Sequence, residues 1–503
     1  MINRLVYLGL IIYSYAACAN PIVDNFAQVK LADQYAQETF KQCLPYTLNT
    51  TVKNEPDGTT YIVTGDISAM WVRDSCAQIY PYVYMSKDTA ELQRIVRGTI
   101  LRHIKHFNSA YQDAPFINSW QEDYSPHEYK WEPDGVAYFI RLVWLYWQIT
   151  KDEQWAHMEG GFAAYIAFNN AVELIKKSIG FTGMVQCKNR PSDDWTTYPY
   201  LIPTNMFLAA MLPKLATMYL TIWHDPVKAE ECNNLSRNIK AGVNSYGIYN
   251  HPIFGKIWVY ETDGVGNYLL MDDANVPSLL AAPYLEFCDH TNAIYRNTRN
   301  YILSTFNPYY FVGSYGKGVG SPHTQNFWIW PLAVIMQALT SNNEQEIQEL
   351  MGYLNNLDSD RYVHESVDPN DPSQYTRNSF AWGDSLYAEL IVKKILGFNF
   401  YPDDATVYIK PYLSSICNTA KLKQPVRFGN RSNVTLYIFG DGSKIDSATI
   451  NGKEVAVDKT KGVEISDDDV VIVVRTEKNR SRVVLSDAYT SSKKGTVISK
   501  VVD

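Results

Sequence analysis

Apolar residues recur at helical spacing along most of the chain, from about residue 22 to residue 396. They follow one another at intervals of three and four residues, which is the pattern of a helix with one buried face. Short polar or Pro- and Gly-rich stretches separate these segments. The pattern predicts helices over residues 26–44, 137–149, 162–175, 205–222, 226–243, 292–303, 326–339 and 380–396.

The periodicity changes near Pro402. Gly397 and Pro402 form a helix stop signal, and short runs that alternate apolar and polar residues follow, as in strands. We therefore predict a mainly α fold with two domains: a helical domain over 20–400 and a small C-terminal all-β sandwich over 401–503. The expected strands are 406–409, 435–439, 448–450, 470–474 and 482–485, with a frayed tail from Ser491.

The first nineteen residues have the pattern of an export signal. Arg4 precedes an apolar run, and the small residues Ala17 and Ala19 are spaced as at a signal-peptidase site. We predict cleavage after Ala19, with a lipoprotein tether at Cys18 as the alternative. No later run approaches the roughly 20 uninterrupted apolar residues that cross a bilayer. We expect a secreted or extracytoplasmic protein without a transmembrane segment.

Composition narrows the class of partner. The formal net charge of −8 argues against nucleic acid and against an anionic membrane surface, so a neutral or cationic partner fits better. The 37 Tyr and 12 Trp fit either a carbohydrate groove or packing between helices. The cysteines after the leader form no Cys-x-x-Cys pair, which leaves buried thiols and disulfides both open. We expect a monomer.

Loops dense in Trp, Tyr, Asp, Glu, Arg and His separate the predicted helices, at residues 64–75, 119–134, 188–200, 260–278, 313–324 and 363–380. A purely structural bundle would not need such loops, and loops commonly carry function. If the helices alternate as inner and outer layers of a closed ring, these loops gather at one end. They would then form a pocket there.

Several motifs stand in these loops in a fixed order. They are Gly65-Asp-Ile-Ser-Ala-Met-Trp-Val-Arg-Asp-Ser75, Arg190-Pro-Ser-Asp-Asp194, Tyr260-Glu-Thr-Asp-Gly264, Met271-Asp-Asp-Ala-Asn-Val-Pro-Ser278, Gly318-Val-Gly-Ser-Pro-His-Thr324, His364-Glu-Ser366 and Thr376-Arg377. In this order they resemble glycoside hydrolase family 125. The resemblance implies an (α/α)6 barrel and an exo-acting, inverting α-mannosidase, typically α-1,6-specific. It also implies that no metal or other cofactor is used and that the partners are α-mannosides. The β domain is an addition to the family pattern.

Inverting glycoside cleavage needs a carboxylic acid to protonate the leaving oxygen and a carboxylate, roughly 6.5–9.5 Å away, to activate water. The resemblance places the acid at Asp193 and the base at Glu365. Asp194, Trp195 and Tyr198 would raise the pKa of Asp193 and keep it protonated. Without the resemblance, Asp193 would be interpreted as a loop or capping residue.

Glu365 should be held ionised so that it can take a proton from water, and we expect Arg377 and His364 to do so. Without the resemblance, Glu365 would be interpreted as one partner of a surface ion pair.

A sugar presents several hydroxyl groups, which a pocket must satisfy with fixed donors and acceptors. The candidates for this role are Asp66, Arg73, Asp74, Glu132, Asp273, Asn275, His323 and Arg377, with Trp71 and Trp382 as stacking surfaces. Arg73 and Asp74 could equally form a structural ion pair, and both tryptophans could simply pack. The acidic runs at 272–273 and 467–469 lack the spacing of a calcium loop, so we predict no metal.

Two other functions remain open. A noncatalytic mannan- or glycan-binding protein on the same scaffold would be expected to lack one of the two carboxylates, and both are present. An exo-glycosidase for another α-linked sugar would keep the carboxylates but differ in the residues that read the hydroxyl groups.

Overall fold

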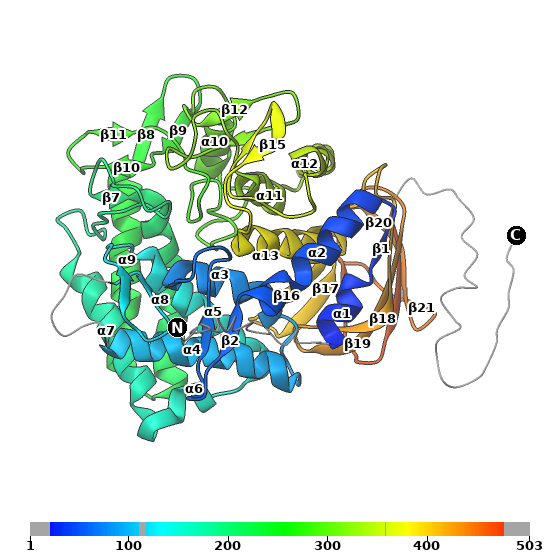
Figure 1. Cartoon of the computed structure of the whole chain (residues 1–503), viewed down its shortest axis with the longest axis horizontal. Coiled ribbons are helices and arrows are strands. Elements are labelled where there is room, and N and C mark those ends of the chain that lie inside the picture. Colours follow the sequence, from blue (N-terminus) through cyan, green and yellow to red (C-terminus); the bar gives the residue numbers. More distant parts are fainter. Residues whose placement is uncertain (1–20, 110–116, 358, 477–503) are drawn as a thin grey trace, which may run out of the picture.

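A large helical part and a smaller β part make up the structure, a computed structural model that describes residues 21–109, 117–357 and 359–476 (Figure 1). The predicted leader at 1–19 with Cys18, the expected strand at 482–485 and the tail from Ser491 lie outside the described residues.

The helices buried on nearly all sides form an inner layer: α3 (Val72–Val83), α5 (Asp134–Thr150), α8 (Ile202–Ile222), α11 (Pro331–Leu339) and α13 (Ala381–Leu390). Within it α3 contacts α5 and α13, α5 contacts α8, and α11 contacts α13. Of the helices in the described ranges, α8 has the length and hydropathy of a membrane span. Because 67% of its most apolar window is buried, we interpret α8 as a core helix.

Amphipathic helices cover this layer. They are α2 (Gln34–Thr50) on α13, α4 (Ala90–Ser109) on α3, α7 (Ala163–Lys177) on α4, α9 (Pro226–Tyr246) on α8 and α12 (Glu344–Leu357) on α11. Shorter helical segments are α1 (Pro21–Ala27), α6 (Gln154–His157), η1 (Met158–Gly161), α10 (Ala293–Ile302) and the π-helical turn η2 (Ile391–Ile395). The helices therefore alternate between two layers, which leaves the connecting loops free to carry chemistry.

The prediction of one helix over residues 26–44 is wrong. The chain instead forms α1, then the strand β1 (Lys30–Leu31), and α2 begins only after Asp33. The Oδ1 atom of Asp33 accepts a hydrogen bond from the Ala36 N–H at 3.0 Å and so caps α2. The helix predicted over 326–339 also begins later, at Pro331, where proline fits the first turn.

Short strands stiffen several of the loops that connect the helices. They pair as β2 (Val52–Asn54) with β3 (Thr60–Ile62), β4 (Met70–Trp71) with β5 (Ser119–Trp120) and β6 (Pro126–Glu128), β7 (Tyr200–Leu201) with β10 (Glu261–Thr262) and β11 (Tyr268–Leu269), β8 (Ile248–His251) with β9 (Gly255–Trp258), β12 (Tyr310–Val312) with β13 (Lys317–Val319), and β14 (Val367–Asp368) with β15 (Asp371–Tyr375). Such short strands show no period in the sequence, which is why the pattern did not predict them.

The C-terminal part contains two sheets. One has the order β1-β18-β19-β23-β20-β21 and the other β16-β17-β22. The bounds are β16 (Phe398–Tyr401), β17 (Thr406–Ile409), β18 (Thr419–Phe428), β19 (Arg431–Phe439), β20 (Ile445–Ile450), β21 (Lys453–Glu454), β22 (Val463–Ile465) and β23 (Val471–Thr476). The rings of Phe398 and Phe428 lie 5.1 Å apart, so the two sheets pack together as a sandwich. The N-terminal strand β1 joins the first sheet, so residues from both ends of the chain build it.

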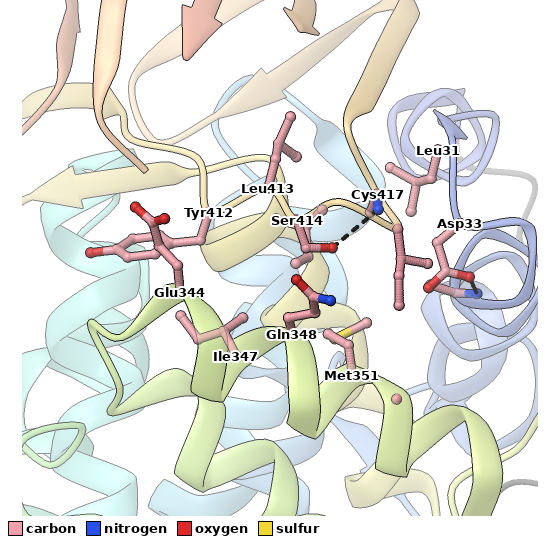
Figure 2. Close-up of a pocket in the computed structure, with 14 residues that line it drawn as sticks. Leu31, Asp33, Glu344, Ile347, Gln348, Met351, Tyr412, Leu413, Ser414 and Cys417 are labelled. Atoms are coloured by element: carbon pink, nitrogen blue, oxygen red, sulfur yellow. Dashed lines mark hydrogen bonds between the residues drawn. The ribbon is translucent and has the colours of Figure 1, made fainter. Parts of the chain in front are cut away.

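Helical and β parts share one apolar core. The Tyr84 ring of the helical part stacks on Phe428 at 4.9 Å, and Phe26 meets Phe398 at 5.7 Å. A cavity of about 20 Å³ lies between α12, the start of α2 and the loop over residues 412–417 (Figure 2). It has room for about one water molecule and is far too small for a sugar.

The sequence left two states open for the cysteines. Cys76, Cys187, Cys232, Cys288 and Cys417 are free thiols, and all but Cys288 are buried; Cys43 is also buried, and its Sγ donates to Asp384 Oδ1 at 3.1 Å. They therefore belong to the packing rather than to a disulfide framework.

Candidate active site

Asp193 lies in a tight turn between α7 and β7, which we call the Asp193 loop (residues 190–198). The turn is closed by the Asp193 N–H bonded to the Arg190 carbonyl at 2.9 Å and the Arg190 N–H bonded to the Asp194 carbonyl at 2.7 Å. Asp193 has a φ of +70°, which is uncommon for a residue other than glycine. Conformations of this kind persist only where the surroundings enforce them, and they cluster at functional sites.

Buried Glu261 ties together both ends of the Asp193 loop. Its Oε1 atom accepts a hydrogen bond from Arg190 Nε at 2.7 Å. Its Oε2 atom accepts the backbone N–H groups of Thr197, at 2.6 Å, and Tyr198, at 2.9 Å. The sequence motif contained Glu261, but no role for it was predicted.

Asp273 and Asn275 also hold this loop in place. Ser192 Oγ donates to Asp273 Oδ2 at 2.8 Å, and Asn275 Nδ2 donates to the Pro191 carbonyl at 2.7 Å. Asn275 Oδ1 in turn accepts the Val276 N–H at 3.0 Å. Both residues were predicted to bind sugar, but their observed contacts position the turn that carries Asp193.

Four carboxyl groups surround the buried guanidinium of Arg73 at the start of α3. Its Nη1 lies 3.0 Å from Glu132 Oε2 and 3.4 Å from Asp134 Oδ2, its Nε lies 3.4 Å from Asp74 Oδ2, and its Nη2 lies 3.6 Å from Asp193 Oδ1. The predicted ion pair of Arg73 and Asp74 therefore exists, within a larger cluster that includes Asp193. Asp134 was not predicted.

The pKa of Asp193 differs from the expectation. Burial raises its pKa, but the Arg73 guanidinium, a hydrogen bond with Glu132 and the Lys130 ammonium group outweigh burial and hold the pKa below its ordinary value. The prediction that its neighbours would raise the pKa is wrong, partly because the Trp195 side chain points outward and is 76% exposed. Burial instead raises the pKa of Glu132 well above its ordinary range.

Glu365 lies just before β14, on a different loop from Asp193. Thr376 Oγ1 donates to its Oε2 at 3.1 Å, and Arg377 Nη1 lies 3.7 Å from its Oε1. Burial raises the pKa of Glu365, and the charges of Arg377 and His323 only partly oppose that rise. We expected its pKa to be held low, so this expectation is wrong. A raised pKa makes a carboxylate a better proton acceptor.

Arg377 is itself fixed by several groups. It has a φ of +61°, its Nε is hydrogen-bonded to Asp66, and its Nη2 donates to the Thr64 carbonyl at 3.1 Å. His364 was predicted to contact Glu365. Its Nδ1 instead lies 2.8 Å from the Arg377 carbonyl and its ring stacks on Tyr375 at 3.5 Å, so it positions the Arg377 backbone.

His323 is influenced by carboxyl groups from both of these loops. Its Nδ1 lies 3.4 Å from Asp194 Oδ1, and this contact raises the pKa of the imidazole. The charges of Glu365 and Asp193 both act on the same ring. The two predicted catalytic carboxyl groups therefore lie near enough to His323 to influence its pKa.

The two predicted stacking tryptophans differ in their surroundings. Trp382 is 3% exposed and packs edge to face against Tyr138 at 6.0 Å, so its observed role is packing. Trp71 is also buried and contacts His127 at 5.1 Å, but its indole N–H has no hydrogen-bond partner. A buried indole N–H normally finds an acceptor, which a ligand could supply here.

A metal site would need several ligating side chains gathered at one point. Within residues 21–109, 117–357 and 359–476, no group of three or more His, Cys, Asp or Glu side chains is arranged to hold a metal ion. The buried Asp272 carboxylate instead accepts the N–H groups of Leu279, at 2.9 Å, and Leu280, at 3.0 Å.

Comparison with known proteins identifies the family. The model of the metal-independent α-mannosidase family GH125 matches residues 33–179 and 174–392. A fission-yeast protein, the meiotically up-regulated gene 157 protein, is 32% identical over 426 residues, which cover 72% of this chain and 83% of that protein. A metal-independent α-mannosidase from Streptococcus pneumoniae, solved with α-1,6-mannobiose in a non-productive complex, superposes with a TM-score of 0.69 at 30% identity. The match covers 74% of this chain and 96% of that chain.

More distant structures share the fold alone. A family 78 rhamnosidase from a Bacillus species has a TM-score of 0.56 at 12% identity and covers 89% of this chain and 43% of that chain. A bacterial glucoamylase has a TM-score of 0.51 at 12% identity, covering 72% of this chain and 55% of that chain. Since the family model spans more than half of the chain and the closer matches agree with it, the protein belongs to glycoside hydrolase family GH125, the metal-independent α-mannosidases.

Proposed function

We propose that the protein is an exo-acting, α-1,6-specific mannosidase that releases terminal mannose with inversion, with Asp193 as general acid and Glu365 as general base. The observation that carries this proposal is the pair of partly buried carboxyl groups on two separate loops whose charges both raise the pKa of His323. The linkage follows the α-1,6-mannobiose complex of the S. pneumoniae relative. The helical layers would form a closed (α/α)6 barrel with the site at one end.

The chemistry assigns one proton transfer to each carboxyl group. Asp193 protonates the glycosidic oxygen while the bond to the anomeric carbon breaks. Glu365, fixed by Thr376 and Arg377, takes a proton from a water molecule that attacks the opposite face. No metal takes part, in keeping with the family.

The remaining predicted groups divide by their contacts. Asp66, Asp74, His323 and Arg377 are partly open or incompletely paired near the carboxyl groups, and with the free indole N–H of Trp71 they would bind sugar hydroxyl groups. Arg73 and Glu132 act on Asp193. Asp273 and Asn275 hold the Asp193 loop, and Trp382 packs against Tyr138. The protein would act outside the cytoplasm after loss of residues 1–19, or tethered at Cys18.

The test is proton NMR of the purified protein acting on α-1,6-mannobiose in the presence of a chelator, beside the Asp193→Asn variant. Early release of β-mannose by the wild type, strongly reduced in the variant, is expected. Early α-mannose would refute inversion, and loss of activity with the chelator would refute metal independence. Failure on every α-mannoside would favour the glycan-binding alternative, and activity on a different α-linked sugar in a panel would change the substrate.

A further inference from the structure

Glu132 and Asp193 each have one buried carboxyl oxygen without a hydrogen-bond donor, and both lie beside Arg73. Glu132 Oε2 accepts Arg73 Nη1 at 3.0 Å and Asn118 Nδ2 at 3.1 Å, so that oxygen is satisfied. Glu132 Oε1 and Asp193 Oδ1 are both buried and receive no hydrogen bond from an N–H or O–H donor. Both carboxyl groups lie on the same guanidinium, with Glu132 Oε2 3.0 Å from Arg73 Nη1 and Asp193 Oδ1 3.6 Å from Arg73 Nη2, and a hydrogen bond between the two side chains affects the pKa of each.

Two ionised carboxylates cannot form such a hydrogen bond, because neither has a proton to donate, and like charges close together in a largely buried site do not both ionise. The charge balance agrees. Arg73 and Lys130 supply two positive charges to Asp74, Glu132, Asp134 and Asp193, and Lys130 Nζ, 3.6 Å from Asp193 Oδ1, also pairs with Glu128 Oε1 at 3.1 Å. At least one proton is needed to complete the contact.

We propose that Glu132 and Asp193 form a carboxyl–carboxylate pair that holds one proton at neutral pH, and that Glu132 is the positioning residue that supplies this proton to Asp193. The proposal rests on the proposed function. The directions of the pKa values support it: burial raises that of Glu132 strongly, whereas the nearby cations lower that of Asp193.

The proton moves from Glu132 to the substrate in two transfers. The Oε1–H bond of Glu132 breaks and an O–H bond forms on Asp193, which leaves Glu132 ionised against Arg73. Asp193 passes the proton to the glycosidic oxygen as the C–O bond of the leaving sugar breaks. As this proton leaves, one proton from solvent returns to Glu132 and restores the pair, so the two carboxylates do not stay ionised together. The charged groups that face it are Arg73 and Asp74 from α3, Lys130 from the loop before α5, Asp134 from α5, Asp194 from the Asp193 loop and His323 from the loop after β13.

The test compares the Glu132→Gln variant with the wild type on two substrates. Gln keeps the shape and can still accept from Arg73, but it has no proton to give. For α-1,6-mannobiose, kcat should fall about 100-fold, in the range of general acid catalysis. For 2,4-dinitrophenyl α-mannoside, whose leaving group needs no proton, kcat should change by less than about threefold by the same reasoning. The basic limb of the kcat/KM profile should move to lower pH.

Asp134→Asn is the matched control. Asp134 lies on the same guanidinium and is equally buried, but it acts on Asp193 only through its charge. This variant should affect both substrates alike. If Glu132→Gln also affects both alike, or leaves the basic limb in place, the pair does not hold the proton and Glu132 is merely structural. If the wild type hydrolyses neither substrate, the proposed function fails instead.

A measurement on the wild type covers the case in which Glu132→Gln does not fold. The dependence of kcat on the deuterium fraction of the solvent should be more curved for mannobiose than for the dinitrophenyl mannoside, because only the former uses the relay. Equal curvature for the two substrates would overturn the proposal.

Discussion

Glu261 holds both ends of the Asp193 loop, and the Glu261→Gln variant tests how strongly the geometry of this loop determines activity. The carboxylate serves Arg190 with one oxygen and the N–H groups of Thr197 and Tyr198 with the other. An amide has only one oxygen. In Glu261→Gln the NH₂ group must therefore face either the guanidinium of Arg190 or the two backbone N–H groups. Whichever it faces then loses its hydrogen-bond acceptor at a position where Glu261 is 0% exposed.

The magnitude follows from these contacts. Breaking a buried ion pair by removing one partner costs about 3–5 kcal/mol, and each buried donor left without an acceptor costs about 1–3 kcal/mol. Because one set of hydrogen bonds survives, we expect a loss of about 3 kcal/mol, at the low end of the range for a buried pair. The Asp193 turn would shift with its ends, and a misplacement of about 1 Å can lower kcat about 100-fold.

Urea unfolding followed by tryptophan fluorescence gives the stability, and mannobiose hydrolysis gives kcat. Glu230→Gln is the control, because Glu230 pairs with Arg237 at the surface with 61% of its side chain exposed. That change should cost less than about 1 kcal/mol and leave kcat unchanged. If Glu261→Gln unfolds at the wild-type urea midpoint and has the wild-type kcat, Glu261 does not stabilise the Asp193 loop. If stability falls while kcat holds, Asp193 does not depend on Glu261.

Two further predictions concern backbone space and a buried charge. Gly65 has a φ of +104°, and in Gly65→Ala the new Cβ would lie 2.5 Å from the Ser379 carbonyl oxygen, so the contact of Asp66 with Arg377 should weaken and both the melting temperature and kcat should fall. Gly352→Ala is the control, because its new Cβ meets nothing within 4 Å. Equal melting temperatures for the two variants would refute the reasoning. Burial lowers the pKa of Lys394 to about 7, below the unfolded value near 10.4, so the unfolded chain binds more protons between these values and stability should rise with pH there. Lys394→Met should remove that rise, and parallel curves of melting temperature against pH for the two proteins would contradict it.

Much of the fold could be predicted because its signals are local. α8 is apolar on all faces, and α9 begins at Pro226 directly after its N-cap residue Asp225. The bounds of both helices were predicted within about three residues. β18 was missed because Lys423, Gln424 and Pro425 interrupt its alternation, at a point where its pairing with β19 shifts register. β1 was missed because its two residues pair with a strand almost four hundred positions later.

The site shows the same limit. The motifs indicated Asp193 and Glu365, but Glu261 acts on Arg190 across 71 positions and Asp134 on Arg73 across 61. Neither spacing has a local pattern. The pKa of Asp193 was predicted in the wrong direction for the same reason, since Asp194 is its neighbour in sequence whereas Arg73 and Glu132 are its neighbours in space.

Taken one at a time, the pKa directions would suit the opposite roles, because that of Glu365 is raised and that of Asp193 is lowered. Reversed roles would leave Glu132 without a purpose, however, since a general base gains nothing from a protonated neighbour that occupies one of its oxygens. With the roles as proposed, both directions have a use: the Glu132 proton supplies the acid, and the raised pKa strengthens the base. Activity should then fall at low pH when Glu365 gains a proton and at high pH when the pair loses its own. An Asp193→Asn variant that kept its activity on the dinitrophenyl mannoside would exclude the reversal, because a missing base would abolish hydrolysis of either substrate.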